Sequence, residues 1–204
     1  AFAGVIDDGS VRSILTKYSE HLSVVAAPVS LDSPDKASPE DIGKLIEALR
    51  EQFDHVVIDT AGVFDDNALA ALDRSDRIVL VGTLDIPSLK GLKLAVSTLD
   101  LLNFGRNTWT LLLNRADGKV GLSPSEFETT LGLKVDHSLV TAREVLTAVN
   151  RGEPLVRSFA NHQNSKALRE LAKSLIPAKA PGVPAQKTAT DRKAVGSRLR
   201  LRKG

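Results

Sequence analysis

Short apolar runs alternate along residues 1–176 with segments whose apolar residues recur at helical spacing. Ser38 followed by Pro39 and two acids is typical of a capped helix start, and Ser123 followed by Pro124 repeats the signature. Helices are predicted over 11–18, 38–53 and 87–102, around Leu69 and Leu72, from Ser123 onward, and near 141–150 and 164–176. Strands are predicted over 22–26, 55–59, 77–81, 108–113 and 133–135.

The order of these elements indicates the fold class. A helix lies between nearly every pair of predicted strands, and most strands are continuously apolar instead of alternating. Strands of that kind are buried on both faces, as in parallel sheets covered by helices. We therefore predict an α/β fold with a mostly parallel, doubly wound sheet.

Composition narrows the class of protein. The chain has 204 residues, of which 42% are hydrophobic and 25% charged, the balance of an ordinary globular domain. It contains no cysteine, which excludes disulfide scaffolds, cysteine zinc sites and thiol nucleophiles. No apolar run reaches the ~18 residues of a membrane-spanning helix. We expect a cytoplasmic protein. Methionine is absent and residue 1 is Ala, so we also expect a piece of a longer protein.

Charge is distributed unevenly. Residues 177–204 hold eight basic residues and one acid, whereas the net charge of residues 1–176 is −5. This tail is rich in Pro, Ala, Gly and Lys and has few large apolar residues, so we predict that it is disordered. It would act as a solubilising extension, or contact nucleic acid or anionic membrane through counterion release.

Polar residues follow three of the predicted strands. They are Asp59, Thr60 and Gly62 after 55–59, Thr83, Asp85 and Ser88 after 77–81, and Asn114 and Arg115 after 108–113. Ligands of open α/β sheets bind outside the carboxyl ends of strands, so these residues are the candidate site.

Two of these residues have both a functional and a structural interpretation. An acid after a buried apolar strand, followed by a glycine-containing turn, is the Walker B pattern: Asp59 would hold Mg²⁺ through water. Alternatively, the Asp59 side chain would cap the following turn or helix. The Asn114 amide could donate to and accept from a purine edge, or it could stabilise a local turn at the strand exit.

The combination of motifs resembles a known family. Residues 53–62, FDHVVIDTAG, resemble a segment of the ParA/MinD family of P-loop ATPases, with His55 as one extra residue, and the spacing to the later strand ends also fits. Within that family the closest likeness is to the CpaE/TadZ branch, associated with assembly and polar placement of Flp (Tad) pili. The segments that carry this likeness are 22–28, 84–90, 119–123 and 148–156.

The resemblance covers about residues 10–176 and implies roles for single positions. Asp59 would be the Walker B acid on the Mg²⁺ side, with Thr60 and Gly62 in the second switch that senses the γ-phosphate. Asn114 would hydrogen-bond adenine, and Arg115 would flank the base. It implies ATP and Mg²⁺ as cofactors of the complete protein. The implied partners are a second copy of the protein and secretion or pilus machinery or polar landmark proteins, with peripheral association at the inner face of the membrane. Near residues 138–139 the chain lacks the proline-containing loop common in relatives.

The strongest family motif, a phosphate-binding loop, is missing from the sequence. Gly43-Lys44 and Gly118-Lys119 are not followed by Ser or Thr and lack the preceding glycine. Asp7 and Asp8 lie too close to the next helix to be the first-switch acid. We therefore expect residues 1–176 to be a partial ATPase domain, the Walker B half, that binds ATP weakly or not at all by itself.

Other functions stay open or are disfavoured. A chromosome-partition or division-site-positioning ATPase of the same family, and a non-enzymatic interaction scaffold, remain alternatives. A receiver domain is disfavoured because the later strand ends in Asn114-Arg115 instead of lysine. The sequence lacks G-x-G-x-x-G, which excludes a Rossmann dinucleotide site, and its four histidines have no metal-ligand spacing.

Overall fold

The computed structural model describes residues 8–26, 37–118 and 121–176. The predicted basic tail, Asp7 and part of the segment 119–123 lie outside these residues. The helices are α1 (Asp8–Ile14), α2 (Pro39–Gln52), α3 (Asp66–Leu72), α4 (Ile86–Leu101), α5 (Pro124–Leu131), α6 (Arg143–Asn150), α7 (Leu155–Ser158) and α8 (Gln163–Leu175), with a 3-10 turn at Arg106–Thr108. The strands are β1 (Leu15–Ser19), β2 (Leu22–Val25), β3 (Ile78–Gly82), β4 (Trp109–Leu113) and β5 (His137–Ser138).

Two helix starts follow the predicted capping chemistry. The Ser38 hydroxyl accepts a hydrogen bond from the Asp41 amide at 3.2 Å, and the Asp41 carboxylate accepts one from the Ser38 amide at 3.1 Å. Ser123 and Glu126 make the same reciprocal pair at the start of α5. In both helices proline occupies the first turn, where no backbone donor is needed, so the predicted starts of α2 and α5 are confirmed.

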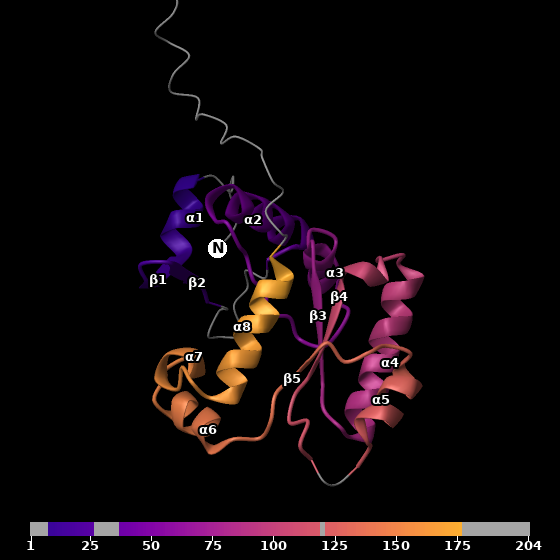
Figure 1. Ribbon diagram of the computed structural model, residues 1–204. Helices are drawn as coiled ribbons and strands as arrows, with labels where there is room; N and C mark the ends of the chain where they lie inside the picture. Colours follow the sequence, from indigo (N-terminus) through magenta and orange to yellow (C-terminus); the bar gives the residue numbers. More distant parts are fainter. Residues whose placement is uncertain (1–7, 27–36, 119–120, 177–204) are drawn as a thin grey trace, which may run out of the picture.

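The central sheet is parallel and has the order β3-β4-β5. Gly82 lies opposite Leu113, and Leu113 lies opposite Ser138, so the three strands end level with one another. Figure 1 shows α4 and α5 together on one side of this sheet and α8 on the other. The predicted α/β class with a mostly parallel sheet is confirmed.

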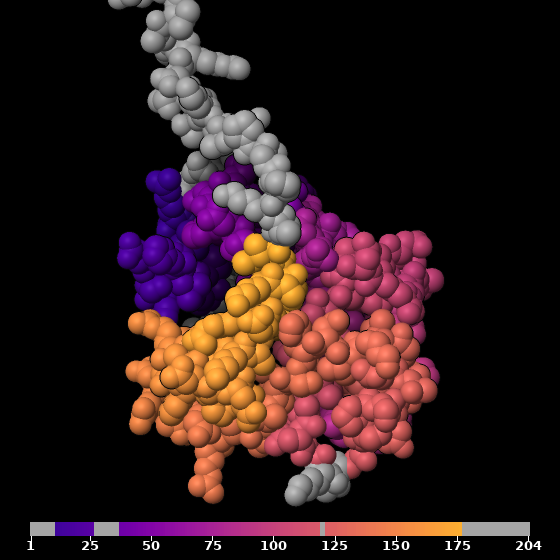
Figure 2. All heavy atoms as spheres, in the orientation of Figure 1, coloured from indigo at the N-terminus to yellow at the C-terminus, as the bar shows by residue number. Residues whose placement is uncertain are grey.

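The main core lies between the sheet and the α4–α5 side. It joins alternate residues of the strands to one face of each helix, and its most enclosed members are Leu99, Leu111, Leu113 and Phe127. On the opposite side α8 packs against β5 and runs along the surface as the yellow segment in Figure 2. Since helices cover both faces, the strands can be apolar throughout, as the sequence predicts.

The N-terminal part differs from the prediction. The helix expected over 11–18 ends at Ile14, and residues 15–19 form β1, which pairs antiparallel with β2. Thr16 and Tyr18 favour extended backbone, and pairing with β2 supplies hydrogen bonds that override the helical spacing. The strand predicted over 22–26 is present as β2, but Leu22 is 48% exposed, so its predicted burial is wrong.

Residues 55–59 are the most important departure. They form no strand, because no described segment supplies a hydrogen-bonding neighbour for them. Val57 is 94% exposed and Ile58 is 38% exposed, so the predicted buried strand is wrong for this chain. Their β-branched composition favours a strand, yet a strand exists only as part of a ladder.

The last strand is also displaced from its expected position. Instead of 133–135, β5 covers His137–Ser138. The Val135 amide donates to the Glu128 carboxylate at 2.9 Å, and the Asp136 carboxylate accepts from the Leu111 amide at 2.7 Å. The Asp136 amide also donates to the Leu111 carbonyl at 3.0 Å, so the contact with β4 begins one residue before the strand. The short helix α7 was not predicted.

The exposure of residues 55–59 leads to a stability prediction. Val57→Asp should change the free energy of unfolding of this chain by no more than about 0.5 kcal/mol, because its side chain is already in water. Val96→Asp, the same replacement at a residue of α4 that is 6% exposed, should cost about 3 kcal/mol or more. Urea denaturation of both variants measures the difference. A large loss in the Val57 variant would show that residues 55–59 are packed.

Candidate functional site

The chain leaves all three strands of the parallel sheet at the same edge. Immediately after β4, the Asn114 amide donates to the Gly82 carbonyl at 2.7 Å. The Leu139 amide, immediately after β5, donates to the Leu113 carbonyl at 2.8 Å. Residues 83–85, 114–117 and 139–142 therefore lie along the carboxyl edge, and we call these three segments the rim. This is where an open α/β sheet binds ligands.

Asn114 and Arg115 form an unusual turn at the centre of the rim. The Asn114 side-chain oxygen accepts a hydrogen bond from the Arg115 amide at 3.0 Å, which is the local-turn role considered from the sequence. Arg115 has a φ of 51°, a left-handed conformation that residues other than glycine rarely adopt. Within the described residues the Asn114 side-chain NH₂ and the Arg115 guanidinium have no partner. The turn therefore leaves both groups available to a ligand.

Thr83, Asp85 and Ser88 form the hydrogen bonds that cap the start of α4. The Thr83 hydroxyl donates to the Asp85 carboxylate, which also accepts from the Ser88 amide at 2.8 Å. The Ser88 hydroxyl accepts from the Thr83 amide at 2.9 Å. The Thr83 hydroxyl is the main reason that the pKa of Asp85 lies below its ordinary value. These polar groups are occupied in holding the helix.

Asp59, Thr60 and Gly62 lie exposed in the irregular segment before α3. The Asp59 and Thr60 side chains make no hydrogen bond or ion pair within the described part of the chain. Asp59 does not cap the following helix, because Asp65 does so by accepting from the Ala68 amide at 2.8 Å. A β-carbon added at Gly62 would meet nothing within 4 Å, so packing in this chain does not require glycine there. The Asp59 carboxylate is free to bind a cation.

The predicted residues thus form two groups. Asn114 and Arg115 are tied to loop 139–142, since the Ala116 amide donates to the Leu139 carbonyl at 2.8 Å. No hydrogen bond or ion pair among residues 8–26, 37–118 and 121–176 joins Asp59, Thr60 or Gly62 to that group. These ranges also contain no cluster of three His, Asp or Glu side chains able to hold a metal ion.

Two residues of the rim network were missed at the sequence level. Asp117, which was not among the candidate site residues, accepts a hydrogen bond from the Thr141 amide at 2.7 Å. That bond is the main cause that lowers the pKa of Asp117. Asn164 in α8 is 3% exposed and contacts Val140 through two hydrogen bonds. Each contact spans 24 residues, and no local pattern in the sequence signals it.

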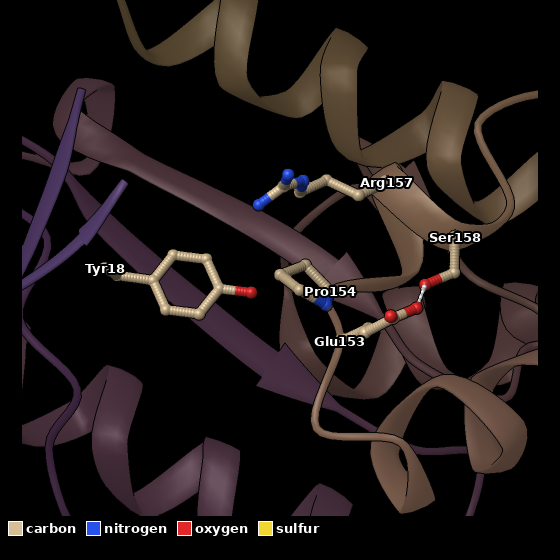
Figure 3. Close-up of a pocket in the computed structure, with 5 residues that line it drawn as sticks. All are labelled: Tyr18, Glu153, Pro154, Arg157 and Ser158. Atoms are coloured by element: carbon tan, nitrogen blue, oxygen red, sulfur yellow. Dashed lines mark hydrogen bonds between the residues drawn. The ribbon is translucent and has the colours of Figure 1, made fainter. Parts of the chain in front are cut away.

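Two cavities lie away from the predicted residues. One, of about 310 Å³, lies between β1 and the α6–α7 region and is lined by Tyr18, Glu153, Pro154, Arg157 and Ser158 (Figure 3). The other, of about 370 Å³, lies between α2 and α3. Since neither is lined by a rim residue or by Asp59, they do not mark the candidate site.

The side chains of the described candidate residues could bind part of a magnesium nucleotide. An amide and a guanidinium suit a base, and the free Asp59 carboxylate suits one side of Mg²⁺. Phosphates require a run of backbone N–H groups at a helix start, together with a lysine. The sequence holds no such loop. The residues present therefore fit the base and one metal ligand, but not the phosphates.

Comparisons with known proteins agree with the fold. No family model matches the chain. The septum site-determining protein MinD of Thermotoga maritima is 22% identical over 182 residues, which cover 86% of this chain and 65% of that protein. The crystal structure of a ParA family ATPase from Chlorobium tepidum superimposes with a TM-score of 0.76 at 18% identity, covering 83% of this chain and 71% of the other. The chain therefore has the fold of the ParA/MinD ATPases, and its sequence is similar to that of MinD.

A nucleotide-bound member of this fold is also similar. MinD of Pyrococcus horikoshii, solved as a complex with Mg-ADP, superimposes with a TM-score of 0.70 at 16% identity and covers 83% of this chain and 70% of its own. The chain spans 65% of the length of its Thermotoga relative. Among the helices of its described residues, none is both long and apolar enough to cross a bilayer.

The Asp117 contact predicts an acid dependence of stability. Because the pKa of Asp117 is lowered in the folded state, its carboxylate stabilises the fold above the ordinary value of 3.8. This contribution is lost as the pH falls through the lower folded value. Asp117→Asn should therefore lower the urea midpoint at pH 7, and the gap to the parent protein should shrink below about pH 4. In Asp54→Asn, a matched change at a residue without a hydrogen bond in the described ranges, no such gap is expected. A gap in the Asp117 variant that is the same at both pH values would contradict the assignment.

Proposed function

We propose that this chain is the base-side and magnesium-side part of an ATP-dependent switch protein of the ParA/MinD type. The observation that carries the proposal is the Asn114–Arg115 turn. Its left-handed backbone holds a free amide donor at the carboxyl edge of the sheet, where ligands of this architecture bind. Backbone strain of this kind is concentrated at ligand sites.

Asn114 is suited to adenine. The adenine edge presents an NH₂ donor beside a ring-nitrogen acceptor, and a carboxamide can pair with both at once. The side-chain NH₂ of Asn114 is free, and its oxygen keeps a second lone pair after accepting from the Arg115 amide. Arg115 would flank the base, because a planar guanidinium stacks on an aromatic ring.

Asp59 is suited to the magnesium side. Its exposed carboxylate, unused by the described fold, would hold Mg²⁺ through water, with Thr60 and Gly62 in the switch that senses the γ-phosphate. Bound Mg²⁺ would supply electrostatic stabilisation of the phosphate charge. Val57 and Ile58 beside it are exposed apolar residues that further protein can cover. We propose that the complete protein supplies both this cover and the phosphate-binding loop.

The biological role that we propose is CpaE/TadZ-like, in assembly or polar localisation of pili. It rests on the segments 84–90 and 148–156, which resemble that branch. In this role the complete protein would be a homodimer whose nucleotide state switches its contacts with secretion or pilus machinery. Division-site positioning is the second candidate, favoured by the homology to a septum site-determining protein.

The ATPase proposal predicts a specific mutant phenotype. In the complete protein, Asp59→Asn should lower kcat for ATP hydrolysis about 100-fold or more, since several kcal/mol of metal-ion stabilisation is lost. Asp54→Asn, five residues earlier and also exposed, should leave kcat unchanged. The isolated 204-residue chain should bind Mg·ATP more weakly than micromolar by calorimetry. Micromolar binding by the isolated chain, or full activity of the Asp59 variant, would refute these assignments.

The two biological roles predict different cellular defects. If the role is in pilus assembly, deletion of the gene removes surface pili and leaves division septa in their normal places, because only pilus placement depends on the switch. Electron microscopy of pili and septum positions in the same cells measures both. Misplaced septa with normal pili would favour the division role.

A further inference from the structure

Loop 139–142 is held on one side by the segment that follows β4. The Leu139 amide and carbonyl are both used, toward Leu113 and Ala116, at 2.8 Å each. The Thr141 amide donates to the Asp117 carboxylate at 2.7 Å. These bonds fix the loop beside Asn114 and Arg115 from the sheet side. Val140, between the anchored residues, takes no part in them.

Asn164 holds Val140 from the opposite side. Its side-chain oxygen accepts from the Val140 amide at 2.9 Å, and its side-chain NH₂ donates to the Val140 carbonyl at 2.8 Å. One carboxamide thus satisfies both polar groups of a single backbone residue. A carboxamide carries a donor and an acceptor on neighbouring atoms, whereas a carboxylate has no donor and an ammonium has no acceptor.

The position of Asn164 in α8 is also fixed by hydrogen bonds. Its backbone N–H donates to His162 Nδ1 at 3.1 Å at the start of α8. The neighbouring Ser165 is fully buried, and its hydroxyl donates to the Phe159 carbonyl at 2.7 Å. Since Asn164 is only 3% exposed, it cannot itself form a substantial contact with a ligand on the rim. Its effect on a ligand must pass through the Val140 backbone.

We infer that Asn164 is a positioning residue for the nucleotide base: it fixes Val140, and with it loop 139–142, as the wall of the base site opposite Asn114. The inference rests on the proposed function, in which a purine binds beside Asn114. Without the amide, the Val140 N–H and C=O would lose partners in a half-buried place, and the loop would shift to reach water. Such a shift changes the base site and leaves the phosphate and metal groups where they are.

The test compares a nucleotide with its phosphate part in the complete protein. Asn164→Ala and the isosteric Asn164→Asp should weaken binding of Mg·ATP about tenfold and leave binding of Mg·tripolyphosphate, which has no base, unchanged. Ser165→Ala is the matched control, because it removes an adjacent buried hydrogen bond that does not reach the loop. It should lower the melting temperature and leave both affinities at the parent values. The Asp variant fills the same space as Asn, so it keeps the test valid if the Ala variant does not fold.

The outcomes separate the two proposals. If the parent protein binds Mg·ATP and the Asn164 variants bind it equally well, or lose tripolyphosphate to the same degree, Asn164 does not position the base. An equal loss of Mg·ATP affinity in Ser165→Ala would also overturn the inference, because general loosening of α8 would then explain the effect. If the parent protein does not bind Mg·ATP, the proposed function fails, and the inference that depends on it fails with it.

Discussion

The level ending of β3, β4 and β5 is the constraint on which the candidate site depends. Parallel ladders place Gly82, Leu113 and Ser138 side by side, so the chain leaves all three strands at one edge. The bond from the Asn114 amide to the Gly82 carbonyl extends the ladder by one residue into the rim. A register shift of one residue would turn the side chains of β4 to the opposite face and displace Asn114 from the edge. The core residues between the sheet, α4 and α5 oppose such a shift, because each would leave its packed position.

Local chemistry made much of the fold predictable. Ser38 and Ser123 predict the starts of α2 and α5, because capping involves only residues within three positions of one another. The strand ends at Asn114 and at Thr83 were also expected, since apolar runs mark buried parallel strands. The absence of a strand at residues 55–59 was not expected. Their composition favours a strand, but whether another strand lies beside them to form a ladder depends on tertiary structure. Likewise, Leu15 and Tyr18 follow the helical spacing of residues 11–18, and the pairing with β2 that overrides it depends on tertiary structure.

The sequence predicted the residues of the candidate site that face a ligand, but not the residues that hold them in place. Asn114 and Arg115 follow directly from the rule that ligands bind at the carboxyl ends of strands. Asp117 and Asn164 could not be found in this way, because their partners Thr141 and Val140 are 24 residues distant. The sequence also could not decide between the two roles of Asn114. The structure shows that its oxygen makes the turn bond while its NH₂ keeps no partner in the described residues.

The two halves of the proposed site differ in how many hydrogen bonds the fold supplies to them. The base side is fixed by bonds from β4, β5 and α8, whereas Asp59 and Thr60 lie in an exposed segment without partners in the described ranges. A switch needs one part that holds the nucleotide and another whose order depends on it. The ParA/MinD fold of the chain is consistent with that division.

The central claim is that Asn114 and Asp59 serve one nucleotide from two sides of the same edge. The most direct measurement is a crystal structure of the complete protein with Mg·ADP. The account predicts the adenine edge within hydrogen-bond distance of the Asn114 amide and the metal on the Asp59 side of the same nucleotide. A nucleotide bound with its base away from Asn114, or with Asp59 on the far side of the sheet from its metal, would contradict the account.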